Sequence, residues 1–201
     1  DEARRLLDLA HRHLNEAAIR LVLVGGLPGT GKSTLAQGLA DARRWAVLRS
    51  DEVRKELAGL PSAARVSSAW GEGIYRPEMT AATYAELLRR AGAALGEGES
   101  VILDASWANG GLREEAGRLA DVVAAELVEL RCVAPPEVAA ARIRSRLPTD
   151  PSDATPEVAA RLAETADPWP TATPLDTSGP PEASLGVALG LVATPRREIS
   201  R

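Results

Sequence analysis

Residues 21–40, LVLVGGLPGTGKSTLAQGLA, constrain the fold more than any other stretch of this sequence. An apolar run of the kind that forms a buried strand breaks into a glycine-rich turn and then continues with helical periodicity. The spacing G-x-x-x-x-G-K-[ST], the Walker A pattern, is satisfied here by Gly26, Gly31, Lys32 and Ser33. Because the pattern follows a strand and opens a helix, it predicts a loop that binds phosphate.

Each residue type in this loop has a physical role. Glycines let backbone amides approach the β- and γ-phosphates of a nucleotide, and the start of the following helix adds partial positive charge. We expect Lys32 to reach the β- and γ-oxygens of ATP and Ser33 to supply a hydroxyl ligand to Mg²⁺. The expected nucleotide-binding residues are Gly26, Pro28, Gly29, Thr30, Gly31, Lys32, Ser33 and Thr34. The reaction stays open, because kinases, GTPases, motor ATPases and switches all use such a loop.

Short apolar strands alternate with helical patterns along the chain. Strands are expected at residues 20–25, 45–49, 100–104, 127–133 and 173–177. Helices are expected at residues 32–43, 51–58, 78–96, 111–125, 135–147 and 155–165. This alternation predicts a three-layer α/β fold, with a mostly parallel five-stranded sheet covered by helices on both faces.

Two turn-rich segments interrupt the alternation. Residues 59–76 are expected near the substrate that accepts the phosphate, and residues 148–154 in a lid that covers about 142–155. The main domain is expected to span residues 19–195. It would follow a leading helix at 1–18, which can link to an upstream domain, and precede a short tail at 196–201.

Composition narrows the class of protein. Lys plus Arg number 24 and Asp plus Glu 28, giving a formal charge of −4 that opposes non-specific nucleic-acid coating but leaves a local basic channel open. The single Cys132 excludes an intramolecular disulfide and a cysteine-based zinc site, and fits a reducing cytoplasm. No apolar stretch approaches a membrane span and the N-terminus lacks the regions of a signal peptide, so a soluble cytoplasmic protein without a membrane partner is expected.

Three charged residues follow the second and third expected strands, where ligands bind in open parallel sheets. Asp51 can orient a hydroxyl acceptor and take its proton, and Arg54, one helical turn on, can hold the acceptor or the γ-phosphate. Alternatively, Ser50 or Asp51 only caps the helix. Asp104 ends the strand in VILDASW, where a magnesium-associated carboxylate is expected, the alternative being a residue that only ends the strand in a turn. The guanine-reading NKxD of a GTPase is absent.

Together, GLPGTGKST, RSDEVRKEL and VILDASW resemble the P-loop kinase family that includes phage polynucleotide kinase, zeta-toxin kinases, gluconate kinase and chloramphenicol phosphotransferase. The resemblance spans most of residues 20–178 and looks closest to the branch fused, in actinobacterial-type proteins, behind an aminoglycoside-phosphotransferase-like domain. The Asp1 start fits such a C-terminal half. The resemblance implies a nucleoside-kinase-like fold with strand order 2-3-1-4-5 and a small lid.

The resemblance also implies roles for single residues. Asp51 would match the general base of the polynucleotide kinases, Arg54 the arginine that contacts the acceptor phosphate, and Asp104 the acid of the third strand. Arg113 falls near an arginine that follows this acid in the relatives, with a gap that differs by one residue. The segment DTSGPPEA, residues 176–183, resembles the loop that lines the adenine.

Arg142 and Arg146 lie four residues apart and therefore on one helical face. The resemblance implies that they are lid arginines that clamp the ATP phosphates. The alternative is a solvated basic face of the helix.

Several other side chains carry weaker expectations. His11 and His13 read as surface residues, and Cys132 as a buried small hydrophobe. Trp70 and Tyr75 either stack on an acceptor or pin their loop to the body of the domain. Trp169 is expected to anchor the chain that enters the last strand.

These features predict an ATP- and Mg²⁺-dependent kinase that transfers the γ-phosphoryl group to a hydroxyl. The acceptor is either a nucleic-acid 5′-hydroxyl or a small alcohol such as a polyol, sugar, nucleoside or antibiotic. The expected catalytic residues are Lys32, Asp51, Arg54, Arg142 and Arg146, and the expected metal ligands are Ser33 and Asp104. The alternative function is a nucleotide-binding regulatory module, or slow ATPase, that controls a fused or partner domain.

Overall fold

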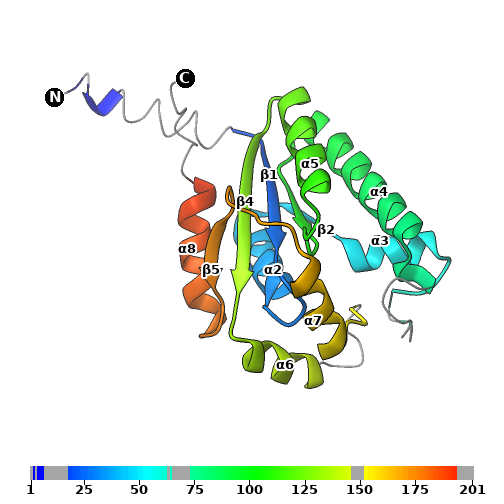
Figure 1. Ribbon diagram of the computed structural model, residues 1–201. Coiled ribbons are helices and arrows are strands. Elements are labelled where there is room, and N and C mark those ends of the chain that lie inside the picture. Colours follow the sequence, from blue (N-terminus) through cyan, green and yellow to red (C-terminus); the bar gives the residue numbers. More distant parts are fainter. Residues whose placement is uncertain are drawn as a thin grey trace.

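The computed structural model describes residues 2, 4–6, 18–62, 64, 73–145 and 152–193. Its centre is a five-stranded sheet in which every pairing is parallel (Figure 1). The strands are β1 (Arg20–Gly25), β2 (Ala46–Arg49), β3 (Val101–Asp104), β4 (Glu126–Val133) and β5 (Thr173–Asp176). They lie in the order β2-β3-β1-β4-β5, which confirms the predicted fold class and strand order.

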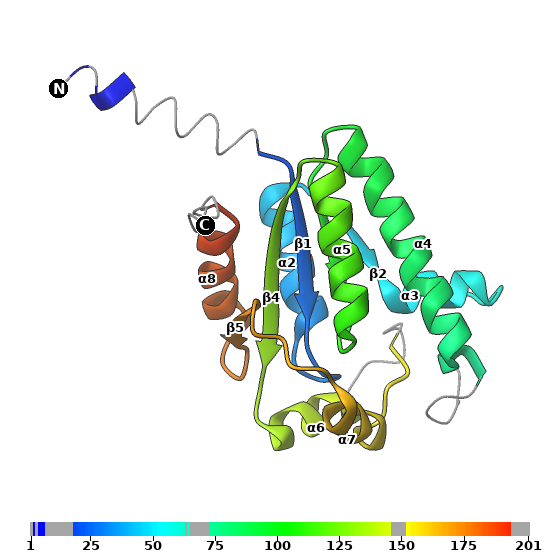
Figure 2. The same cartoon turned by 45° about the horizontal axis from the view of Figure 1, so that its top comes forward.

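Helices cover both faces of this sheet. They are α2 (Lys32–Arg43), α3 (Ser50–Leu57), the 3-10 turn η1 (Gly73–Tyr75), α4 (Pro77–Gly96), α5 (Gly110–Val122), α6 (Pro136–Arg144), α7 (Pro156–Thr165) and α8 (Pro181–Ala193). Figures 1 and 2 show α4 and α5 on one face of the sheet and α2 and α8 on the other. No helix within the described ranges combines the length and apolar content needed to cross a membrane.

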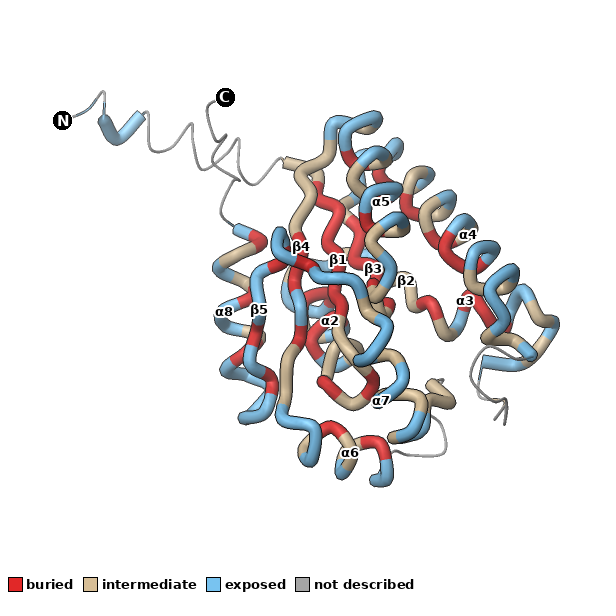
Figure 3. Tube along the Cα trace, in the orientation of Figure 1, coloured by how far each residue is buried: buried red, intermediate tan, exposed pale blue. Residues whose placement is uncertain are grey.

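The two faces of β1 build two separate cores. Leu21 and Leu23 pack with the apolar side chains of α4 and α5, whereas Val22 and Val24 pack with those of α2 and α8. Alternate strand residues point to opposite faces, so a continuously apolar strand is what a sheet covered on both sides requires. All four side chains are fully buried, and Figure 3 shows the buried segments concentrated in this central layer.

Helix α8 was not predicted, and the segment 176–183, expected to be a loop, contains its start at Pro181. The helix is apolar almost all round, so it lacks the amphipathic period from which a surface helix is predicted. It packs along α2, where the side chain of Leu185 lies 3.1 Å from where a Cβ on Gly38 would be. The predicted lining loop is therefore shorter than expected and ends in a helix N-terminus.

The helix predicted at 111–125 ends earlier than expected. Asn109 caps α5 by accepting a 3.2 Å hydrogen bond from the amide of Leu112. The helix then ends at Val122 because Ala124 adopts a left-handed φ of 54°. This turn brings the chain directly into β4.

Helices α6 and α7 pack against each other across the carboxyl end of the sheet, below the loop that joins β1 to α2 (Figures 1 and 2). We call this unit the α6–α7 pair. The chain that leaves it is fixed by Arg113, which donates to the carbonyl oxygen of Pro168 at 2.7 Å and to that of Trp107 at 2.6 Å. The indole of Trp169 donates a 3.0 Å hydrogen bond to Glu129, which confirms Trp169 as an anchor.

Some predictions fall on residues that the structure does not describe. They concern His11, His13, Trp70, Arg146, most of the leading segment 1–18 and the tail 196–201. The middle of the predicted lid, residues 146–151, belongs to the same group.

Candidate active site

The turn between β1 and α2 has the backbone geometry that the glycine pattern predicts. Gly26, Gly29 and Gly31 have φ values of 136°, 81° and 85°, a region that glycine enters without steric cost. A Cβ atom on Gly26 would lie 2.5 Å from the carbonyl oxygen of Cys132, and one on Gly29 would meet the backbone of Ala139 in α6. The loop is therefore enclosed by the end of β4 on one side and by α6 on the other.

Hydrogen bonds within the protein fix the shape of this loop. The hydroxyl of Thr30 donates to the carbonyl oxygen of Leu27 at 2.7 Å, and the amide of Gly26 donates to Ser106 at 3.2 Å. The hydroxyl of Thr177, just after β5, bridges the carbonyl oxygens of Thr30 and Val133. A loop fixed in this way loses little conformational entropy when phosphate binds.

Asp104 lies at the end of β3, with only 4% of its surface exposed, where Lys32 and Ser33 act on it. Burial raises the pKa of its carboxyl group, and the charge of Lys32 and a hydrogen bond from Ser33 oppose that rise. Its Oδ1 atom is buried without a hydrogen-bond partner. An orphaned carboxylate oxygen beside a serine hydroxyl fits the oxygen ligands that Mg²⁺ prefers.

A Mg²⁺ ion held by Ser33 and Asp104 would need phosphate oxygens or waters as further ligands. No group of three or more His, Cys, Asp or Glu side chains forms a candidate metal cluster among the described residues. Mg²⁺ in nucleotide sites is normally held by one or two protein groups together with substrate phosphates. The positions of Ser33 and Asp104 fit such a pair.

A cavity of about 850 Å³ opens beside the loop. Its walls come from the loop and α2, from Arg49 at the end of β2, from Arg142 in α6, and from the chain around Thr177 and the start of α8. Pockets of several hundred Å³ hold cofactor-sized ligands. The cavity therefore has room for a nucleotide whose phosphates lie on the loop.

Arg142 joins two walls of this cavity. Its Nη2 atom donates to the carbonyl oxygen of Thr177 at 2.7 Å and to that of Ser178 at 3.3 Å. Its Nη1 atom is buried without a partner and lies 3.6 Å from where a Cβ on Gly31 would be. Nη2 thus links α6 to the chain after β5, while Nη1 faces the phosphate-binding loop.

On the far side of the loop, Asp51 occupies the first turn of α3. The N-cap of this helix is Arg49, which makes no side-chain capping hydrogen bond, so neither Ser50 nor Asp51 is the cap. The charge of Asp51 raises the pKa values of Asp104 and of Tyr75, although burial is the larger cause in both. Asp51 is therefore close enough to both Asp104 and Tyr75 for its charge to act on them.

Arg54 is buried, with 6% of its surface exposed. It donates from Nη1 to the carbonyl oxygen of Ile74 and to the hydroxyl of Thr80, both at 3.1 Å. Its guanidinium lies 5.1 Å from the centre of the Tyr75 ring. These contacts fix the chain that enters α4. Of the two roles expected for Tyr75, they support the one in which it pins its loop to the body of the domain.

Three contributing residues were missed by sequence reasoning. Arg49 lies 3.8 Å from Asp104, with which it is paired in the strand register, and Thr177 closes the loop as described above. Both follow or end parallel strands on the same sheet edge as Asp104, and that position could have singled them out. The third, Lys55, is buried beside Asp153, and no periodic signal in the sequence marks it as buried.

The family model of an AAA domain (AAA_33) matches residues 21–169, from β1 to the anchor at Trp169. The chain belongs to this AAA-domain family. Proteins of Mycobacterium bovis and Mycobacterium tuberculosis, named uncharacterized protein Mb2027c and uncharacterized protein Rv2004c, are each 43% identical to this AAA domain over 187 residues. The alignments cover 93% of this chain and 37% of each relative, so the chain spans little more than a third of their length.

Solved kinases share the fold of this AAA domain. A sugar kinase from Janibacter sp. HTCC2649 has a TM-score of 0.61 at 22% identity and covers 87% of this chain and 94% of its own. A gluconokinase from Sinorhizobium meliloti 1021 has a TM-score of 0.62 at 17% identity, with coverages of 88% and 92%. The Mycobacterium tuberculosis APS kinase CysC, in complex with AMPPNP and APS, has a TM-score of 0.61 at 18% identity, with coverages of 88% and 99%. At these identities the likeness shows the P-loop kinase fold alone.

Proposed function

We propose that this AAA domain is an ATP-dependent kinase that transfers the γ-phosphoryl group to a hydroxyl. The observation that supports it best is the convergence of Asp51 and Asp104 beside Lys32 and Ser33 at one edge of the sheet. A nucleotide switch needs the loop and a magnesium-type carboxylate. Transfer to a hydroxyl also gains from a second carboxylate that can take the acceptor's proton, and the nearness of Asp51 to Asp104 supports this role for it.

In this mechanism each residue has one task. Lys32 and the free Nη1 of Arg142 would neutralise the charge that moves from the γ-phosphate to the leaving oxygen. Ser33 and Asp104 would hold Mg²⁺, which would supply positive charge against the phosphates of the nucleotide. Asp51 would orient the acceptor hydroxyl and accept its proton as the new P–O bond forms and ADP leaves.

We propose a small, uncharged hydroxyl compound as the acceptor. A polynucleotide end would bring phosphates, which proteins neutralise with accessible Lys and Arg side chains. In α3, Arg54 and Lys55 are buried and donate to protein groups, whereas Glu52 and Glu56 are exposed. The two cations of α3 are thus held by protein groups, and its exposed carboxylates pair with Arg49 and Arg90, which leaves α3 without a free cation for the phosphates of a nucleic-acid end.

The test is to follow label from γ-labelled ATP and Mg²⁺ in parallel mixtures. One mixture contains 5′-hydroxyl oligonucleotides, and the other contains pooled polyols, sugars and nucleosides. Label on a small alcohol supports the whole proposal, and label on oligonucleotide ends keeps the kinase but overturns the acceptor class. Label in inorganic phosphate alone, at a rate that no acceptor changes, overturns the kinase in favour of a slow ATPase or regulatory module.

A further inference from the structure

Lys55 is a buried lysine with a full set of partners. Its side chain is 1% exposed, and its Nζ atom lies 3.1 Å from Oδ2 of Asp153, whose side chain is 4% exposed. Nζ also donates to the carbonyl oxygens of Ser62 and Ala64, at 3.2 and 2.5 Å. An ammonium group has three N–H donors, so all three are used.

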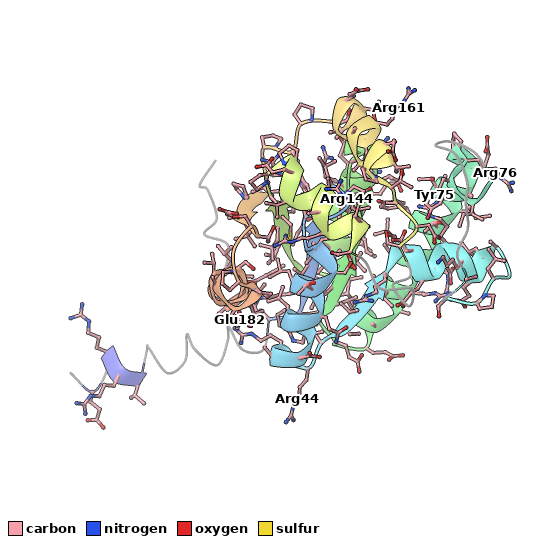
Figure 4. All side chains as sticks on the ribbon, turned by 90° about the horizontal axis from the view of Figure 1, so that it is seen from below. Arg44, Tyr75, Arg76, Arg144, Arg161 and Glu182 are labelled. Carbon is pink, nitrogen blue, oxygen red and sulfur yellow. The ribbon has the colours of Figure 1, made fainter. Side chains whose placement is uncertain are left out.

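This ion pair joins two parts of the site that are distant in sequence. Lys55 lies on α3, one turn beyond Asp51, whereas Asp153 lies two residues before Thr155, the cap of α7. Because α7 packs on α6 and α6 carries Arg142, the contacts run without a break from the acceptor helix to the nucleotide cavity. Figure 4 shows the neighbouring Tyr75 between α3 and the chain that enters α7.

Tyr75 strengthens this connection. Its hydroxyl lies 3.5 Å from Oδ2 of Asp153, and its ring lies against Arg54. Burial and the charges of Asp51 and Asp153 raise the pKa of Tyr75, so the phenol keeps its proton and remains a donor. One aromatic side chain therefore contacts the α7 connection, the acceptor helix and the surroundings of Asp51.

Stability alone is a poor explanation for this arrangement. Removing two charges from water costs several kcal/mol per ion, so a buried ion pair is often no more stabilising than well-packed apolar residues. Such a pair does fix one relative position, because either partner left alone is a strongly unfavourable buried charge. The Lys55–Asp153 ion pair therefore favours a single relative position of helix α3 and the α6–α7 pair.

We propose that Lys55 is a positioning residue that couples the nucleotide side to the acceptor side. ATP bound on the loop fixes the α6–α7 pair through Arg142, and Asp153 carries that constraint to Lys55 and hence to α3 and Asp51. Nucleotide binding then orders the acceptor site before transfer. The purpose of this coupling rests on the proposed function, but the coupling itself can be measured without any acceptor.

The test uses hydrogen exchange with the non-hydrolysable analogue AMPPNP and Mg²⁺. The reporting amides are Ala58, Gly59 and Leu60, which close the end of α3 and do not line the nucleotide cavity. In the wild type, saturating AMPPNP is expected to slow their exchange roughly tenfold. In Lys55→Met and Asp153→Asn the slowing should fall below about twofold, while AMPPNP still binds.

Controls separate coupling from stability. Asp121→Asn changes an exposed carboxylate at the end of α5 and should retain the wild-type slowing. A merely structural role would raise exchange equally with and without AMPPNP, and that result, or full slowing in both variants, would overturn the proposal. If Lys55→Met does not fold, the nearly isosteric Asp153→Asn decides the question. Failure of the acceptor screen with intact coupling would reject the kinase and leave the coupling standing.

Discussion

Arg142 in α6 donates a 2.7 Å hydrogen bond to the carbonyl oxygen of Thr177 and so ties the α6–α7 pair to the chain after β5. The same hydroxyl-bearing residue, Thr177, bridges to the carbonyl oxygen of Thr30 in the phosphate-binding loop. Three segments distant in sequence thereby meet around one cavity. Because these segments share hydrogen bonds, substitutions of single residues around the cavity should have distinct effects.

Arg142→Lys should weaken nucleotide binding. Lysine keeps the charge but cannot donate to Thr177 and to a phosphate in the same planar fork. A hydrogen bond to a charged group contributes about 1.5–3 kcal/mol, so AMPPNP affinity measured by calorimetry should fall roughly 10- to 100-fold. Arg144→Lys, two residues on and exposed, is the matched control. Equal affinity in both variants would show that Arg142 does not reach the nucleotide.

Gly29→Ala should damage the loop far more than its backbone angle alone predicts. Gly29 and Gly98 have similar φ values of 81° and 86°. A Cβ at Gly98 would meet nothing within 4 Å. A Cβ at Gly29 would lie about 3.0 Å from the Cα of Ala139 and closer still to its carbonyl oxygen. Gly98→Ala should therefore cost only the left-handed strain, about 1–2 kcal/mol of unfolding free energy. Gly29→Ala should cost more in urea unfolding and also abolish AMPPNP binding. Equal losses in the two variants would contradict the packing of α6 on the loop.

Cys132 should be almost inert in the folded protein. Burial raises the pKa of its thiol to about 12, from an ordinary value of 9.0. At pH 8 roughly one thiol in ten thousand is ionised, and the side chain is also inaccessible. Iodoacetamide labelling followed by mass spectrometry should be slow until guanidinium unfolds the chain, and rapid labelling of the folded protein would refute this.

The raised pKa of the Cys132 thiol also predicts the direction in which the free energy of unfolding changes at alkaline pH. The folded pKa lies above the unfolded one, so this thiol's contribution is fully present below about pH 9 and is lost as the pH rises toward 12. Unfolding midpoints in urea should therefore fall across that interval, and less so in Cys132→Ala.

The fold was largely predictable because its strands are continuously apolar. Buried parallel strands and helices with a clear period leave a direct signal, and the order β2-β3-β1-β4-β5 followed from the family resemblance. Helix α8 escaped because an apolar helix on an edge has no polar face to reveal its period. The early end of α5 escaped because a left-handed alanine at position 124 has no sequence signature.

The site was predictable only where chemistry and spacing coincide. Lys32, Ser33 and Asp104 lie together as the motifs indicated. By contrast, Arg54 was expected to hold the acceptor or the γ-phosphate and Lys55 carried no expectation, yet both are buried against the chain before α4 and α7. Their partners are carbonyl oxygens, the hydroxyl of Thr80 and one distant carboxylate, which only the tertiary fold brings together.

The central claim is that Asp51 takes the proton of the acceptor hydroxyl. The most direct measurement is the rate of label transfer from γ-labelled ATP to the acceptor found in the screen, for wild type, Asp51→Asn and the exposed Glu56→Gln. We predict that Asp51→Asn lowers kcat roughly 10²- to 10⁴-fold with AMPPNP affinity nearly unchanged, and that Glu56→Gln behaves like wild type. Transfer by Asp51→Asn at the wild-type rate would contradict the account.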